Sequence, residues 1–109
     1  MATTYKVLGQ LNPSATTAST LYTVGAGKSA VLSTIAVTNQ ASTSATYRVA
    51  IRPAGETLAA KHYIAYDSTV AANDSTMITI GVTLAATDVV TVYASSGTVS
   101  FNAFGSEIA

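Results

Sequence analysis

Apolar and polar residues alternate along most of this chain, and that pattern restricts its fold more than any other feature. In Thr46–Arg52, Tyr, Val and Ile alternate with Thr and Arg, and in Thr98–Ala103, Val, Phe and Ala alternate with Thr, Ser and Asn. Successive side chains of a β-strand point to opposite faces, so this alternation predicts strands with one face in a core and the other in water. The residue types agree, because Val, Ile, Thr and Tyr favour a pleated surface.

The alternating stretches divide the chain into about eight short strands separated by turn signals. The expected strands are Tyr5–Leu8, Thr20–Val24, Ser29–Asn39, Ala45–Arg52, Tyr63–Asp67, Thr76–Val82, Val89–Ala94 and Thr98–Phe104. At this length and spacing they predict one all-β domain over residues 1–109, an antiparallel β-sandwich of jelly-roll or immunoglobulin-like topology. Ser95-Ser96-Gly97 is the strongest signal for a tight hairpin.

Two segments depart from the strand pattern. Residues 9–19 contain a run of Ser, Thr and Ala with Pro13 and are expected to form a loop or an extended arm. An arm could lie across a neighbouring subunit, although an ordinary surface loop is the commoner outcome. Thr57–Lys61 contains good helix formers but is long enough for only about one turn.

The composition predicts a protein that normally forms part of an assembly of protein subunits. Only 9% of the residues are charged, and the formal net charge is zero, so electrostatic repulsion gives little protection against self-association. The five basic residues are spread along the chain and form no cluster that could neutralise a run of phosphates, although Arg48 and Arg52 could share a strand face. We therefore expect no binding of nucleic acid.

Other partners are limited by what the sequence lacks. Without Cys there is neither a disulfide framework nor a thiolate metal site. No apolar run approaches the length of a spanning helix, and the first residues, Met1–Lys6, are polar rather than signal-like. We expect no membrane association and expect synthesis in a cytoplasm.

No residue set predicts an enzyme. His62 is the only His and has no recognisable nucleophile or metal-ligand set around it. Gly25–Ser29 resembles a phosphate loop, but Tyr22 stands where the first Gly should be and a strand pattern follows. Asp67, Asp74 and Asp88 are expected to accept backbone N–H bonds at turns. We expect no catalytic residue, cofactor or metal.

The six tyrosines are the remaining candidates for contact with a partner. Exposed Tyr can stack on sugars or anchor an interface. Tyr47 and Tyr63 fit inward positions and are expected in the core. Tyr66 and Tyr93 are the better candidates for surface contacts, although a core position remains the leading interpretation for any single Tyr.

Three stretches together resemble a family of short virion structural proteins of tailed bacteriophages, including phages of marine bacteria and cyanobacteria. They are Leu21–Asn39 with its Gly25-Ala26-Gly27 turn, Tyr66–Thr76, and Leu84–Gly105. The resemblance covers nearly the whole chain through turn-and-strand patterns that carry no chemistry. It implies a place on the virion, copies of the same chain as partners with a trimer favoured by analogy, and contacts with major capsid or tail proteins.

Two functions from different classes follow as expectations. The first is a capsid-decorating (cement or spike) protein that packs against neighbouring subunits. The second is a tail- or fibre-associated module that binds a receptor or carbohydrate through Tyr66 and Tyr93. A hydrolase is the third and weakest hypothesis, because no nucleophile and base can be paired.

Overall fold

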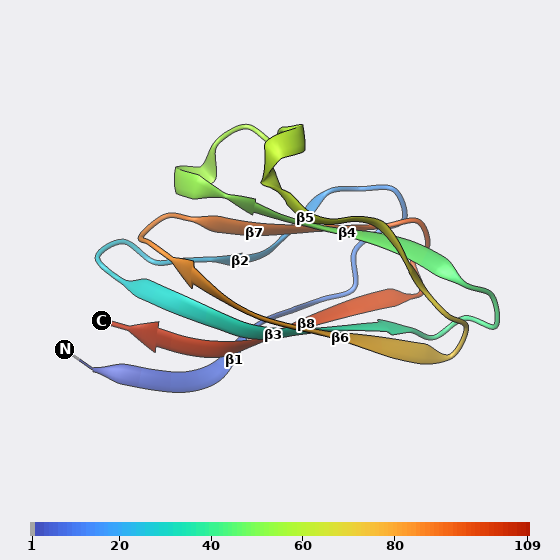
Figure 1. Ribbon diagram of the computed structural model, residues 1–109, viewed down its shortest axis with the longest axis horizontal. Coiled ribbons are helices and arrows are strands. Elements are labelled where there is room, and N and C mark those ends of the chain that lie inside the picture. The colour runs from blue at the N-terminus through green and yellow to red at the C-terminus, as the bar shows by residue number, and fades with distance from the viewer. Residues whose placement is uncertain (1) are drawn as a thin grey trace.

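The computed structural model describes residues 2–109 as eight strands and two short 3-10 turns (Figure 1). The strands are β1 (Thr3–Leu11), β2 (Ser19–Thr23), β3 (Ser29–Asn39), β4 (Ala45–Arg52), β5 (Tyr63–Val70), β6 (Asp74–Leu84), β7 (Val89–Ala94) and β8 (Val99–Ile108). The 3-10 turns η1 (Pro53–Gly55) and η2 (Ala60–His62) lie in the connection between β4 and β5. The bounds expected for β3, β4 and β7 are confirmed.

The strands form two four-stranded antiparallel sheets that pack face to face, as the two layers in Figure 1 show. Sheet A has the order β1-β8-β3-β6, and sheet B has the order β2-β7-β4-β5. Every connection except the one from β4 to β5 crosses from one sheet to the other. This is the strand order of a jelly roll, so the expected β-sandwich is confirmed and the topology is the first of the two considered.

The core lies between the sheets and is built by the alternating apolar positions. Phe101, Leu32 and Ile35 from sheet A are fully buried, as are Val49 and Val92 from sheet B. Tyr47 is 4% exposed and meets Phe101 edge to face, with ring centroids 6.3 Å apart. Tyr47 is therefore the core residue that the alternation predicted.

Two glycines allow backbones to approach closely, one within sheet A and one between the two sheets. A Cβ at Gly105 would collide with the carbonyl oxygen of Val31 on the neighbouring strand β3, where the β3–β8 register shifts. A Cβ at Gly9 would collide with the carbonyl oxygen of Leu21 in the opposite sheet. The backbones approach closely at these points because no side chain separates them.

Two expectations about the connections are wrong. Ser95-Ser96-Gly97 joins β7 in sheet B to β8 in sheet A, so it is a crossing between layers and not a hairpin. Residues 9–11 belong to β1 and pair with β8, and Ser19 begins β2, so the expected loop or arm is shortened to 12–18. That loop is held on this molecule, since Asn12 donates to the carbonyl oxygens of Gly97 and Val99.

Candidate functional site

The outer faces of the two sheets differ in charge and in aromatic content. On sheet A the cross-strand register aligns Val7 with Phe104, and the charged side chain beside this pair is Lys6 on β1, which is paired with Glu107. On sheet B the outward positions of β4 carry Arg48 and Arg52, and the adjacent strand β5 carries Asp67. The charged side chains on the outer face of sheet B therefore lie on two adjacent strands.

Tyr66 and Tyr93, the two surface tyrosines proposed from sequence, meet at Arg48. The Arg48 Cζ lies 4.2 Å from the ring centroid of Tyr66 and 4.2 Å from that of Tyr93. The three residues come from adjacent strands, because β4 pairs with β7 on one side and with β5 on the other. A guanidinium between two aromatic faces is attracted to both rings, so the three side chains form one rigid group.

Asp67 fixes the guanidinium of Arg48 between the rings. Its carboxylate accepts from Arg48 Nε at 2.7 Å and from Nη2 at 3.3 Å. The bond to Asp67 raises the pKa of Arg48 further above its ordinary high value. Asp67 has a φ of 51° at a register shift of β5, and this backbone conformation is one that Asp tolerates better than most residues.

The turn role expected for the aspartates is confirmed for two of the three. Asp88 accepts from the backbone N–H groups of Ala54 and Ala85, and Asp74 accepts from that of Ser75. Asp67 differs because its carboxylate binds a side chain, Arg48, on the neighbouring strand. The expectation that Asp67 caps a turn is therefore wrong.

Tyr63 does not lie in the core as expected. It pairs with Ala50 at an outward position and packs edge to face against Tyr66, with centroids 4.9 Å apart. The register shift around Ile64 puts Tyr63 on the outer face. Tyr63 and Tyr66 line a surface hollow of about 630 Å³ together with Leu58, Ala59 and Ala60. The tyrosine cluster thus continues into a hollow that the sequence did not reveal.

The far wall of this hollow is the connection 53–62, which Arg52 holds in place. Arg52 Nε donates to the carbonyl oxygen of Glu56 at 2.6 Å, and Nη2 donates to that of Gly55 at 3.1 Å. Its third nitrogen, Nη1, donates to the Thr91 hydroxyl at 3.3 Å. Arg48 and Arg52 do share the outer face of β4, but each is committed to local partners.

His62 is buried beneath the same connection and bonds to two of its residues, Ala59 and Glu56. Its side chain is 4% exposed, and its Nδ1 accepts from the Ala59 N–H at 3.0 Å. Nε2 lies 3.2 Å from Glu56 Oε1 and, since Nδ1 is an acceptor, donates to that carboxylate. This bond and the nearby Lys61 lower the pKa of Glu56. Both ring nitrogens of His62 thus hold the loop in place.

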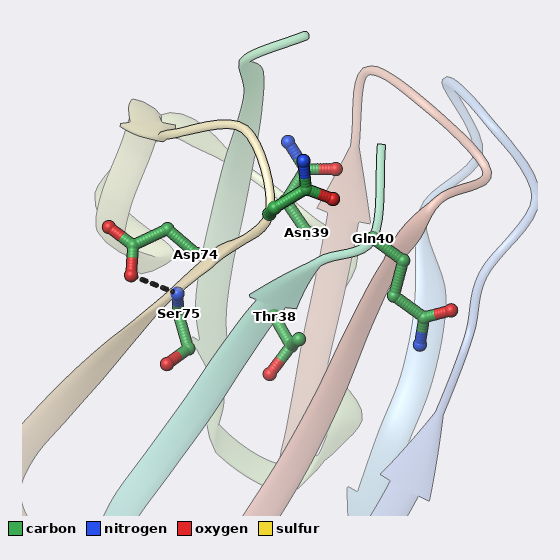
Figure 2. Close-up of a pocket in the computed structure, with 6 residues that line it drawn as sticks. Thr38, Asn39, Gln40, Asp74 and Ser75 are labelled. Atoms are coloured by element: carbon green, nitrogen blue, oxygen red, sulfur yellow. Dashed lines mark hydrogen bonds between the residues drawn. The ribbon is translucent and has the colours of Figure 1, made fainter. Parts of the chain in front are cut away.

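A second hollow, of about 400 Å³, lies at the end of β3 and β6 (Figure 2). Its polar side chains do not converge on a common point: Asp74 and Gln40 lie on opposite sides of Asn39 in Figure 2. Asn39 is 1% exposed, and its side-chain amide forms hydrogen bonds with backbone groups of the neighbouring loops. Asp74 is bonded to the Ser75 N–H. Asn39 therefore stabilises the loops around this hollow, and the polar side chains there do not converge as those of a catalytic or metal site would.

Within residues 2–109 no three His, Cys, Asp or Glu side chains lie close enough together to hold a metal ion. The same part of the chain contains no helix long and apolar enough to cross a membrane. The functional candidates are therefore the aromatic hollow on sheet B and the outer face of sheet A with its exposed large apolar side chains.

Comparison with models of protein families, with curated proteins and with solved structures finds no match. The fold and the two surfaces described above are consequently the basis for assigning a function.

Proposed function

We propose that this chain is a non-enzymatic structural protein of a tailed-phage virion, a capsid-decorating (cement or spike) subunit that packs against copies of itself and neighbouring virion proteins. The observation that carries the proposal is the outer face of sheet A. Large apolar side chains stay exposed there, led by Tyr5 at 85% and Met77 at 60%. An exposed apolar patch of this kind marks an interaction surface.

The apolar side chains of this face are organised around a shallow hollow. Val7 and Phe104 are cross-strand partners that are 45% and 37% exposed. Phe104 also lines a hollow of about 400 Å³ with Tyr5, Val31 and Gly105. Lys6 is the one charged residue that lines this hollow, and its ammonium pairs with Glu107 at 3.2 Å. Because that charge already has a partner, covering the hollow with another protein leaves no unpaired ion to desolvate. The same-chain partner is favoured because two neutral copies do not repel each other.

The location is tested by mass spectrometry of purified virions from the phage that encodes this chain, followed by immunogold labelling. We expect the protein in the particle at high copy number, with label on the head. Label confined to the tail would support the second function below, and absence from intact virions would refute both.

The packing surface is tested by charging its most exposed positions. Tyr5→Lys and Met77→Lys should each reduce the oligomer mass measured by light scattering, with little effect on the monomer fold because both side chains are largely exposed. Thr20→Lys, at an exposed outward position of sheet B, is the matched control. A wild-type protein that remains monomeric at high concentration would contradict self-packing, whereas a mass of three chains would identify the favoured trimer.

The second candidate is a tail- or fibre-associated module that binds a receptor or carbohydrate. It is favoured by the rigid group of Tyr66, Arg48 and Tyr93 on the outer face of sheet B. Aromatic side chains that are already fixed lose little conformational freedom on binding. Binding of labelled protein to host cells, abolished by Tyr66→Ala, would support this function.

A further inference from the structure

The hollow beside Tyr63 and Tyr66 has the dimensions of a small-molecule site. Its volume of about 630 Å³ falls inside the range of roughly 300–1,000 Å³ typical of ligand pockets. Two of its five lining residues are tyrosines, and the other three are Leu58, Ala59 and Ala60. Tyr66 is 58% exposed in the described structure, so much of its surface is free to contact a ligand.

The chemistry of the lining selects a neutral ligand with one apolar face and several hydroxyl groups. No lining residue is charged, and the three cations nearest to the tyrosines and the loop each have a partner: Arg48 bonds Asp67, Arg52 bonds backbone carbonyls, and Lys61 lies 3.7 Å from Glu56. A phosphate or another anion would have to compete with these partners. Aromatic rings beside Leu and Ala offer contact to the C–H face of a sugar ring, and phenol hydroxyls can exchange hydrogen bonds with sugar hydroxyls.

Asp67 does not line the hollow, but it bonds the Arg48 guanidinium that lies over the Tyr66 ring and so offers a polar group next to that lining residue. Its side chain follows Tyr66 directly and remains 46% exposed although it holds Arg48. An ionised carboxylate is acceptor-only and can still accept from a hydroxyl beyond its bonds to Arg48. Aromatic surface and a fixed carboxylate thus lie next to each other, a combination that distinguishes a sugar from a purely apolar ligand.

Both sides of the hollow are fixed before any ligand arrives. Arg48 holds Tyr66 from the sheet side. Arg52 and His62 hold the connection 53–62 on the opposite side. A ligand therefore does not have to order a flexible loop, and more of the contact free energy remains as affinity.

We propose that the hollow formed by Leu58, Ala59, Ala60, Tyr63 and Tyr66 binds one or two residues of a neutral carbohydrate, with Tyr66 as the stacking platform and Asp67 accepting from sugar hydroxyls. This inference rests on the second of the two proposed functions and names its site and ligand class. It does not depend on packing through sheet A.

The test is titration of the ¹⁵N-labelled protein with neutral oligosaccharides: cellohexaose, chitohexaose, mannohexaose and galactohexaose. At least one of them should shift the amide signals of residues 58–67. Tyr66→Ala should weaken its binding at least tenfold. Tyr5→Ala, a Tyr removed from the opposite sheet face, should leave the affinity unchanged within twofold. Ala60→Arg is a second variant that blocks the hollow without removing any part of the Arg48 group, and it should abolish the shifts.

Three outcomes would overturn the inference. They are no response of residues 58–67 to any of these sugars, equal binding by the Ala60→Arg variant, or binding of a decaproline peptide at the hollow in the absence of sugar binding. The oligomer mass is measured on the same samples. Loss of sugar binding with intact self-association would refute only this site, whereas a monomeric protein that binds sugar would refute only packing through sheet A.

Discussion

At the scale of single residues, Asn39 is the clearest case of a buried polar side chain that the fold requires. It is 1% exposed at the end of β3, and its Nδ2 donates to the carbonyl oxygens of Thr43 and Ala71 at 2.8 and 3.3 Å. Its Oδ1 accepts from the Ala41 N–H and the Thr98 hydroxyl. Asn39 therefore ties three loops to one strand end.

Asn39→Asp should destabilise the fold by about 3 kcal/mol, because a carboxylate replaces the amide donor and faces carbonyl oxygens in a buried site. The free energy of unfolding in urea measures the loss. Asn102→Asp is the control, since the Asn102 oxygen accepts from Gln10 on the outer face and an Asp can do the same. Equal losses for the two variants would contradict the role given to Asn39.

Glu107 makes stability depend on pH. It accepts from the Tyr22 hydroxyl at 2.6 Å and pairs with Lys6 at 3.2 Å, and these bonds lower the pKa of Glu107 in the folded state. Burial, followed by the bond to Glu107, raises the pKa of Tyr22, so its hydroxyl remains a donor through neutral pH.

We expect the protein to lose stability as the pH falls below about 4.5. A carboxyl with a lowered folded-state pKa binds more protons when unfolded, so its contribution is complete above the unfolded pKa and disappears as pH falls through the folded one. Glu107→Gln should reduce the difference in unfolding free energy between pH 7 and pH 3. An unchanged difference would show that other groups govern the acid response.

Tyr22→Phe removes the hydroxyl that donates to Glu107 and should lower the free energy of unfolding at pH 7 by about 1 kcal/mol.

The tyrosines show which positions at the candidate site could be predicted from the sequence and which could not. Alternation predicted a buried Tyr47, and the structure agrees. It made Tyr66 and Tyr93 only the better candidates for surface contacts, and the structure places both around Arg48. The prediction of a core position for Tyr63 was wrong, because the register shift around Ile64 turns the Tyr63 side chain to the outer face of the sheet. Pattern alone cannot locate such a shift, since one extra residue leaves local composition unchanged.

At the scale of elements, the connection between β4 and β5 carries one side of the proposed sugar site and depends on the fork of Arg52. A Lys at this position would keep the charge but could not bond the Glu56 and Gly55 carbonyls in parallel. Arg52→Lys should lower stability by about 1 kcal/mol and speed hydrogen exchange in residues 54–62, while the sheets keep their protection.

Arg48→Lys is the matched control for that experiment. It removes the planar group between Tyr66 and Tyr93 and should disturb β5 and β7 without loosening residues 54–62. Faster exchange of the connection in both variants would show that the two arginines do not act on separate parts of the site.

The strands were predictable from sequence because each carries its own alternation, but their pairing was not. Ser95-Ser96-Gly97 looked like a hairpin because a Gly-containing turn stands between two strand patterns, yet β7 and β8 lie in different sheets. A turn sequence specifies a reversal of the chain and not the layer that the next strand enters. The hollow was missed for a related reason, since residues 58–60 reach Tyr66 only through the tertiary fold.

At the scale of the whole molecule, the sandwich separates two surfaces of opposite character and brings its ends together. The outer face of sheet A exposes large apolar side chains such as Tyr5 and Met77, whereas that of sheet B holds the fixed Arg and Tyr group. The first described residue, Ala2, lies beside the last, since the Ala109 N–H donates to the Ala2 carbonyl at 2.9 Å, and Figure 1 shows β1 and β8 next to each other there. Strands β1 and β8, at opposite ends of the chain, are antiparallel neighbours.

This arrangement predicts that a circular permutant folds faster than the natural chain. A linker of about five Gly and Ser residues would join Ala109 to Ala2, and new ends would open between Ala26 and Gly27 in the turn before β3. Pairing of Thr3 with Ile108 would then close a short loop instead of nearly the whole chain. The free-energy cost of closing the loop, which is entropic, falls by about 2 kcal/mol for such a change.

If β1 and β8 pair before the folding barrier, that change should raise the folding rate about tenfold, and unfolding should be little affected. Stopped-flow experiments followed by tyrosine fluorescence measure both rates, since the chain has six Tyr and no Trp. A faster-folding permutant that still self-associates and still binds sugar would show that both surfaces belong to the sandwich and not to its chain ends. An unchanged folding rate would instead place the pairing of β1 with β8 after the barrier, with the β3–β6 pair or sheet B forming first.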